Sequence, residues 1–186
     1  MAKIQLKPHT VLCPVPAVMV SCGTPTGKHN IITIAWTGTV CSDPPMLTIA
    51  VRPTRHSYQL ISETKEFVVN IPSRAMAETL DYCGLVSGRV ADKFAERGLT
   101  ALAGSQLQYA PLIAECPINL ECHVEQELLL GSHVLFIARI VAVHADADIV
   151  DDKQHINYQQ AQPIAYAGSN YYGLGDYLGR FGFSRQ

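Results

Sequence analysis

Two arginines, a histidine and a serine lie within six residues of one another, and side chains of these kinds can hold a phosphate. They belong to the segment RPTRHS, Arg52 to Ser57. Arginine donates charge-assisted hydrogen bonds to phosphate oxygens, and a serine hydroxyl adds another donor. A helix that begins near Thr54 would add its positively polarised N-terminus. The residues alone leave two interpretations open, a phosphate site and a solvated helix start.

The stretch before this segment, Asn30 to Pro45, joins a β-branched strand to a run of small hydroxyl residues. The residues predict a strand over Ile31 to Trp36, then a turn with free backbone N–H groups, and then a strand over Met46 to Val51. We expect the two strands to pair as neighbours around a loop that Asp43-Pro44-Pro45 stiffens. A turn of free donors beside phosphate ligands indicates a bound phosphorylated cofactor.

Composition excludes several other classes of protein. With 186 residues, 48% of them hydrophobic, the chain suits a single domain over residues 1–186. It has 14 basic and 16 acidic residues and no basic run, so nucleic acid is not an expected partner. The apolar stretch Val11 to Cys22 contains two prolines and is too short to span a bilayer. We therefore expect a cytoplasmic protein with no membrane partner.

The motifs of other chemistries are missing from the sequence. It has no GxGxxG after a strand, no GxxxxGK[ST] and no nucleophile elbow. The six cysteines form no C-x-x-C pair, so most are expected to be buried thiols rather than disulfides. Cys116, Cys122 and His123 come nearest to a metal pattern, but Cys122 and His123 are neighbours that would point to opposite faces of a strand. No metal site is predicted.

The remaining patterns predict short helices among many strands. In the first half we expect strands over Val11 to Gly23 and Glu66 to Ile71. We expect helices over Thr54 to Thr64 and over Ser73 to Tyr82, the second ended by Gly84, and a helical turn at Ala91 to Arg97.

The second half of the chain shows the clearest periodicity. Apolar and polar residues alternate from Ile118 to Glu125, and Gly131-Ser132 would turn that strand back into Val134 to Val143 as a long hairpin. About six strands interrupted by short helices indicate a mainly β fold, an antiparallel barrel with peripheral helices. The tail, residues 166–186, is rich in Gly and Tyr and is expected to lie across a ligand or a partner subunit without regular structure of its own.

Several of these segments, in this order, resemble the flavin reductase-like family, which includes flavin reductases, ferric reductases and flavoredoxin. The similarity covers nearly the whole chain. It rests on the string Asn30 to Pro45, the PP-x-L-x-I-x-V strand after it, RPTRHS, EFVVNI, DKFAERGLT (Asp92 to Thr100) and GSHVLFIARIVAVH (Gly131 to His144).

The resemblance implies a six-stranded FMN-binding split barrel and a homodimer with FMN near the subunit interface. It implies that the flavin ring lies along the turn Trp36 to Cys41 and that the phosphate sits near RPTRHS, with Lys93 reaching the phosphate or the ribityl chain. The implied cofactor-binding residues are Asn30, Trp36, Thr37, Gly38, Thr39, Val40, Cys41, Arg52, Arg55, His56, Ser57, Lys93, Tyr171 and Tyr172.

Two residues are candidates for a role in catalysis. The resemblance places Cys41 near the flavin ring, as in ferric reductases, and His133 on the nicotinamide or substrate side. Each has an ordinary alternative, since Cys41 can be an inert buried thiol and His133 a surface residue in a turn. Likewise, Trp36 can shield the flavin or fill the barrel end, and Tyr171 and Tyr172 can stack on the flavin or pack at an interface.

The expected activity is that of an NAD(P)H-dependent flavin reductase-like oxidoreductase, which passes electrons through FMN to an acceptor. Two alternatives remain. One is a flavoredoxin-like FMN electron carrier that a protein partner reduces. The other is a split-barrel binding module without catalytic activity.

Overall fold

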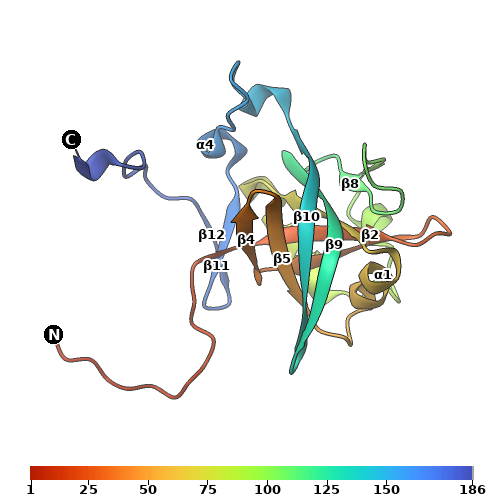
Figure 1. The fold of residues 1–186 in the computed structure, drawn as a ribbon, viewed down its shortest axis with the longest axis horizontal. Coiled ribbons are helices and arrows are strands. Elements are labelled where there is room, and N and C mark those ends of the chain that lie inside the picture. The colour runs from red at the N-terminus through yellow and green to blue at the C-terminus, as the bar shows by residue number, and fades with distance from the viewer. Residues whose placement is uncertain (186) are drawn as a thin grey trace.

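Apolar side chains from six strands and one helix meet in a core that fills the interior of a barrel. Figure 1 shows the strands that form this barrel. The computed structural model describes residues 1–185. The main sheet has seven strands, in the order β3-β2-β6-β9-β10-β5-β4, and its neighbouring strands are antiparallel. The strands are β1 (Val15–Pro16), β2 (Val18–Gly23), β3 (His29–Ile34), β4 (Thr37–Ser42), β5 (Pro45–Val51), β6 (Glu66–Ile71), β7 (Ala101–Leu102), β8 (Leu112–Ile113), β9 (Ile118–Leu130), β10 (His133–Ala145), β11 (Ile164–Ala167) and β12 (Asn170–Gly173).

The helices are short and lie outside the barrel, so the predicted mainly β class with peripheral helices is confirmed. The predicted strand over residues 66–71 matches β6, and the predicted long hairpin is β9 and β10. The helices are α1 (His56–Thr64), α2 (Ala77–Leu85), α3 (Lys93–Glu96) and α4 (Tyr158–Ala161), with 3-10 turns at Arg74–Met76, Ala147–Ile149 and Phe183–Arg185.

The predicted pairing of residues 31–36 with residues 46–51 is wrong. The residues between them, expected to form a turn, are strand β4, and it is β4 that pairs with β5. Thr37 Oγ1 donates to the Thr48 carbonyl at 2.7 Å, and the ladder with β5 occupies backbone groups that the sequence suggested were free. Threonine and valine favour strands, and this preference outweighed the turn signal of the small residues. The main sheet therefore has seven strands where six were predicted.

Two predicted helix boundaries also differ from the structure. Arg55, not Thr54, occupies the N-cap position of α1, and no side chain caps that helix. Gly84 lies inside α2 instead of ending it, and a Cβ there would lie 3.1 Å from Thr33 Cβ. Gly84 is thus used for the close approach of α2 to β3.

A second core lies on the outer side of β2 and β3, where α2 and α3 cover the sheet. Met19 of β2 and Ile31 of β3 pack there against Leu80, Cys83 and Phe94 from the helices. All residues of β2 are buried, because the barrel interior covers one face and this second core covers the other. The arrangement fixes α2 directly beside the end of β3.

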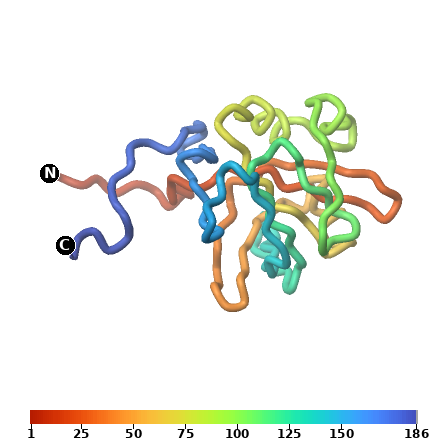
Figure 2. Tube along the Cα trace, turned by 90° about the horizontal axis from the view of Figure 1, so that it is seen from above, coloured from red at the N-terminus to blue at the C-terminus, as the bar shows by residue number. Residues whose placement is uncertain are grey.

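Both ends of the chain leave the barrel on the same side (Figures 1 and 2). The predicted strand over residues 11–23 begins only at Val15, and residues 1–14 form an exposed arm. The expectation of an irregular tail is wrong for its first residues, because β11 and β12 form a hairpin that pairs with β1. Residues 174–185 are largely exposed. None of the helices among residues 1–185 is long and apolar enough to cross a membrane.

Two buried carboxylates tie the loop before β8 to the barrel. Glu121 is fully buried and accepts hydrogen bonds from the backbone N–H groups of Ser105, Gln106 and Leu107, and it contacts His144 at 2.6 Å. Burial alone would raise the pKa of Glu121, but these hydrogen bonds outweigh it and lower the pKa to about 2. Glu66 accepts in the same way from Gln108 and Tyr109 N–H groups. These bonds hold the loop against β6 and β9.

Candidate functional site

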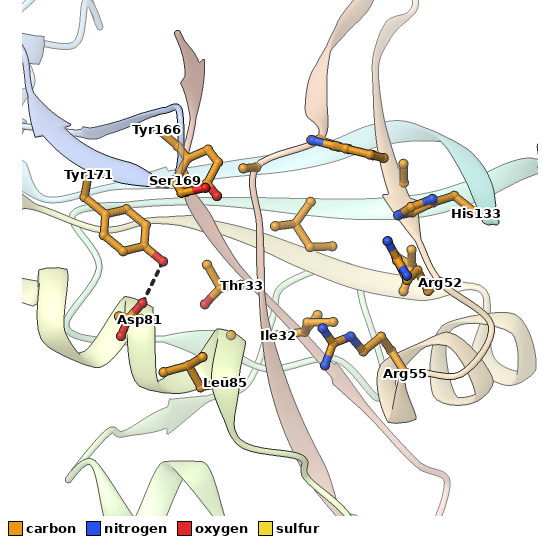
Figure 3. A pocket seen from close by; sticks show the side chains of 17 residues that line it. Ile32, Thr33, Arg52, Arg55, Asp81, Leu85, His133, Tyr166, Ser169 and Tyr171 are labelled. Atoms are coloured by element: carbon orange, nitrogen blue, oxygen red, sulfur yellow. Dashed lines mark hydrogen bonds between the residues drawn. The ribbon is translucent and has the colours of Figure 1, made fainter. Parts of the chain in front are cut away.

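Two adjoining pockets open beside β3. The first, which we call the β3 pocket, has a volume of about 420 Å³ and lies between the end of β3, the end of β5, α2 and the β11–β12 hairpin (Figure 3). The second, the α1 pocket, has a volume of about 350 Å³ and lies at the start of α1. Ile32, Arg52, Arg55 and Gly84 line both pockets, so the two are continuous. Pockets of these sizes suit a small molecule or a cofactor.

The α1 pocket is strongly cationic. Its lining includes three arginines, a lysine and a histidine but no acidic residue: Arg52, Arg55, Arg89, Lys93 and His56. The first residues of α1 also line it, and the first turn of that nine-residue helix contains no acidic side chain. Backbone N–H groups at a helix N-terminus have no partners within the helix, so they add to the attraction for an anion.

One ring nitrogen of a residue that lines this pocket has no partner. His56 Nδ1 is buried and makes no hydrogen bond to any described residue. Burial and the charges of Arg89 and Lys93 lower the pKa of His56 and favour its neutral form, whereas an anion beside the ring would raise that pKa again. A bound phosphate could supply the missing hydrogen-bond partner of this nitrogen and would be attracted by the cationic residues that line the pocket.

Buried polar side chains hold the pocket wall in position. Asn30 Nδ2 donates to Ser57 Oγ at 2.8 Å, and Asn30 and Ser57 are only 4% and 1% exposed. Gly88 lies so close that a Cβ there would be 2.0 Å from Asn30 Oδ1. These contacts fix the Ser57 hydroxyl at the first turn of α1.

Lys93 joins two elements beneath the pocket. Its buried ammonium donates to the Ile31 carbonyl at 2.6 Å and to the Cys83 carbonyl at 2.8 Å, which leaves one of its three donors for a ligand. Burial lowers the pKa of Lys93. These two hydrogen bonds join β3 to α2. The predicted contact of Lys93 with a phosphate or ribityl chain stays a prediction.

An aromatic pair closes one end of the β3 pocket. The rings of Trp36 and His133 lie 4.5 Å apart at an angle of 38°, and Ser132 Oγ is 2.9 Å from His133 Nδ1. Burial, with a contribution from the Arg52 charge, lowers the pKa of His133 and favours its neutral form. The pair therefore presents an uncharged aromatic surface beside the arginines.

The opposite end of the β3 pocket contains a carboxylate and two tyrosines (Figure 3). Tyr171 donates its hydroxyl proton to Asp81 Oδ1 at 3.0 Å, and its ring lies 5.5 Å from that of Tyr166. Burial and the neighbouring Asp81 carboxylate raise the pKa of Tyr171 to about 12. The hydroxyl thus remains a proton donor, and the contact joins the C-terminal hairpin to α2.

The structure brings together nine of the residues singled out in the sequence. Trp36, Arg52, Arg55, His133 and Tyr171 line the β3 pocket, and Asn30, Arg52, Arg55, His56, Ser57 and Lys93 line the α1 pocket.

The other predicted residues lie elsewhere. Thr37 and Gly38 line a larger apolar groove of about 1080 Å³ beside the N-terminal arm. Thr39, Val40, Cys41 and Tyr172 line none of these three pockets. Cys41 Sγ donates to the Asp43 carbonyl, and Tyr172 points away from the pocket because alternate residues of β12 face opposite sides. A cofactor or redox role for these four residues stays a prediction.

Sequence reasoning missed several lining residues. Arg89 follows α2 in a loop of small residues, and Asp81 resembles any polar residue on a helix surface. Tyr166 and Ser169 belong to the hairpin that was expected to be irregular. Only the pairing of that hairpin with β1 brings them beside β3, so no local pattern could identify them.

A family model described as the flavin reductase like domain matches residues 10–175. The chain belongs to the flavin reductase-like family. This flavin reductase-like protein is similar in structure to the flavoredoxin of Desulfovibrio vulgaris (Miyazaki F), with a TM-score of 0.92, 30% identity and complete coverage of both chains. The split-barrel fold that the resemblance implied is thereby confirmed.

Curated relatives of this flavin reductase-like protein have related sequences over most of their length. An uncharacterized protein of Archaeoglobus fulgidus is 33% identical over 145 residues, which cover 77% of this chain and 80% of that protein. The reductase component of a 4-nitrophenol 4-monooxygenase/4-nitrocatechol 2-monooxygenase of Rhodococcus opacus is 29% identical over 123 residues, 66% of this chain and 60% of that component.

Proposed function

We propose that the protein binds FMN across the two adjoining pockets, accepts electrons from NAD(P)H and passes them to an acceptor. The observation that carries this proposal is the continuity of a cationic pocket with an aromatic-walled one. Arg52 and Arg55 stand where the two meet. A molecule with a phosphate at one end and a flat ring at the other matches that pattern of charge and shape.

The residues of the α1 pocket fit the phosphate group. Arg55, His56 and Ser57 supply two charged or chargeable donors and a hydroxyl, and the unpartnered His56 Nδ1 would gain an acceptor. A doubly charged phosphate would also be stabilised by Arg89 and by the N-terminus of α1. Removal of these groups should therefore weaken the binding of FMN more than that of riboflavin, which has no phosphate.

The residues of the β3 pocket fit the ring. When bound, FMN would supply the hydride-accepting chemistry, so the protein needs no acid–base triad. Trp36 and the β11–β12 hairpin, which line this pocket, are the groups that would hold the ring. His133 is assigned to the nicotinamide side, where its lowered pKa would keep a second positive charge away from the oxidised nicotinamide.

A homodimer is part of the proposal. The groove beside the N-terminal arm is lined mostly by apolar residues and includes the half-exposed Trp36. The arm itself exposes Ile4, Leu6 and Leu12. A second copy that covered these residues would remove an apolar surface from water next to the β3 pocket.

The full-length similarity to a flavoredoxin supports a second candidate, an FMN electron carrier that is reduced by a protein partner and not by nicotinamide. The similarity to a monooxygenase reductase component supports the first candidate. Both candidates use the same FMN pockets, so they differ only in the electron donor.

The test is anaerobic mixing of FMN-loaded protein with NADH and then with NADPH, while the flavin absorbance is followed. Rapid bleaching with either nucleotide is the expected result and identifies the donor. FMN that stays oxidised with both nucleotides, but is reduced by dithionite, would refute the nicotinamide step and favour the carrier. Failure to bind FMN at all would refute both candidates and leave a binding module.

A further inference from the structure

The β3 pocket has opposite charges at its two ends, and the acidic end has no role in the proposal above. Arg52, Arg55 and His133 lie at one end, while Asp81 lies at the other and contacts Tyr171 (Figure 3). Asp81 is the one acidic residue among those that line either pocket in the described chain. None of the salt bridges among residues 1–185 involves Asp81. Its charge is therefore not neutralised by a neighbouring cation.

We propose that the Asp81 carboxylate lowers the reduction potential of the flavin held in the β3 pocket, with Tyr171 as the residue that positions the carboxylate. The inference rests on the proposed FMN site. It adds a residue that tunes the cofactor and whose effect can be measured apart from catalysis.

The effect of Asp81 on the flavin is electrostatic. Hydride transfer delivers two electrons and one proton, so the reduced ring carries one more negative charge than the oxidised ring. A carboxylate on the pocket wall repels that added charge, and a partly buried site screens the repulsion less than water does. The carboxylate therefore weakens the binding of reduced FMN relative to oxidised FMN, which is equivalent to a lower potential.

Tyr171 determines where this charge sits. Its hydroxyl donates to Asp81 Oδ1 at 3.0 Å, and its ring packs against Tyr166, so the carboxylate is held between α2 and the hairpin. The remaining oxygen, Asp81 Oδ2, accepts no hydrogen bond from residues 1–185. A low potential would suit a protein that hands its electrons on, because it increases the driving force toward the acceptor.

The decisive variant is Asp81→Asn, which removes the charge and keeps an oxygen for Tyr171. We expect the affinity for reduced FMN, relative to oxidised FMN, to rise about tenfold. For a two-electron couple this corresponds to a potential about 30 mV more positive, measured by anaerobic equilibration with a reference dye. Tyr171→Phe keeps the charge but removes the hydrogen bond that positions it, so the potential should rise in the same direction by a smaller amount, and an unchanged potential would refute the positioning role of Tyr171. Asp152→Asn, at an exposed position away from both pockets, is the matched control and should leave it unchanged.

The outcomes separate this inference from the proposed function. If wild-type protein binds no FMN, the FMN site itself is refuted. If FMN binds but Asp81→Asn leaves the potential unchanged, or lowers it, the role of Asp81 is refuted while the site stands. Should Asp81→Asn fail to bind FMN, Asp81→Ser removes the same charge with a smaller side chain, and the same rise in potential is required of it.

Discussion

Arg55 and His56 together should contribute most of the selectivity for a phosphorylated flavin. Arg55 lines both pockets, and His56 brings the buried Nδ1 that has no partner. Hydrogen bonds to charged groups contribute about 1.5 to 3 kcal/mol each. Arg52 and Arg89 remain in the double variant Arg55→Ala, His56→Ala, and they should recover part of the loss. We therefore expect FMN binding to weaken by about 10- to 100-fold, or about 1.4 to 2.7 kcal/mol.

The assay is titration of apoprotein with FMN and, separately, with riboflavin, followed by quenching of the flavin fluorescence. Because riboflavin lacks the phosphate, its affinity should change by less than about twofold in the same variant. Arg74→Ala, His155→Ala is the matched control, because both residues are exposed and line neither pocket. Unchanged FMN affinity in the Arg55, His56 variant, or an equal loss for both flavins, would refute the phosphate site.

Three further substitutions test the frame around the site. Lys93→Met leaves two buried carbonyls without a donor, so it should lower the free energy of unfolding in urea by about 2 kcal/mol. Gly88→Ala brings a Cβ within 2.0 Å of Asn30 Oδ1 and should displace the contact with Ser57, which weakens FMN binding by about tenfold in the same titration. Glu121→Gln should cost about 3 kcal/mol at neutral pH, since the pKa of Glu121 falls from 4.5 to about 2 on folding. Wild type has this extra stability above the pKa of Glu121 in the unfolded chain, 4.5, and loses it as the pH falls through about 2. The free energies of unfolding of variant and wild type, measured in urea, should therefore become equal in acid.

Each of these variants has a control at an exposed position. Lys153→Met, Gly175→Ala and Glu63→Gln make the same chemical changes away from the β3 pocket, the α1 pocket and the anchored loop. A Lys93→Met variant as stable as wild type would contradict the structural role of Lys93. For Gly88, undiminished FMN affinity is the contrary result. For Glu121→Gln, the contrary result is a decrease in the free energy of unfolding that stays the same from neutral pH to about pH 2.

The sequence predicted the elements that local patterns specify. Alternation of apolar and polar residues along Ile118 to Glu125 is enough to indicate a half-buried strand, and Gly131 supplies the positive φ of 58° that its turn requires. The RPTRHS segment predicts a phosphate site for a similar reason, because arginine, histidine and serine, whose side chains suit an anion, lie close together in the chain.

Features that depend on tertiary pairing could not be predicted in this way. The residues of β4 are compatible with a turn or an edge strand, and only the ladder with β5 decides between them. Asp81 and Tyr171 are 90 positions apart, and neither has a distinctive sequence context. Their contact depends on the β11–β12 hairpin docking against β1, which is a long-range event.

The two pockets also differ in how much of the chain is needed to build them. Every residue that lines the α1 pocket comes from between Asn30 and Lys93, whereas the β3 pocket also requires residues as late as Tyr171. During synthesis the residues proposed to bind the phosphate are therefore present long before the hairpin that faces Asp81. If FMN binds as proposed, a growing chain could hold its phosphate early but could not enclose its ring until β12 had emerged, so only protein translated through β12 would retain the whole cofactor.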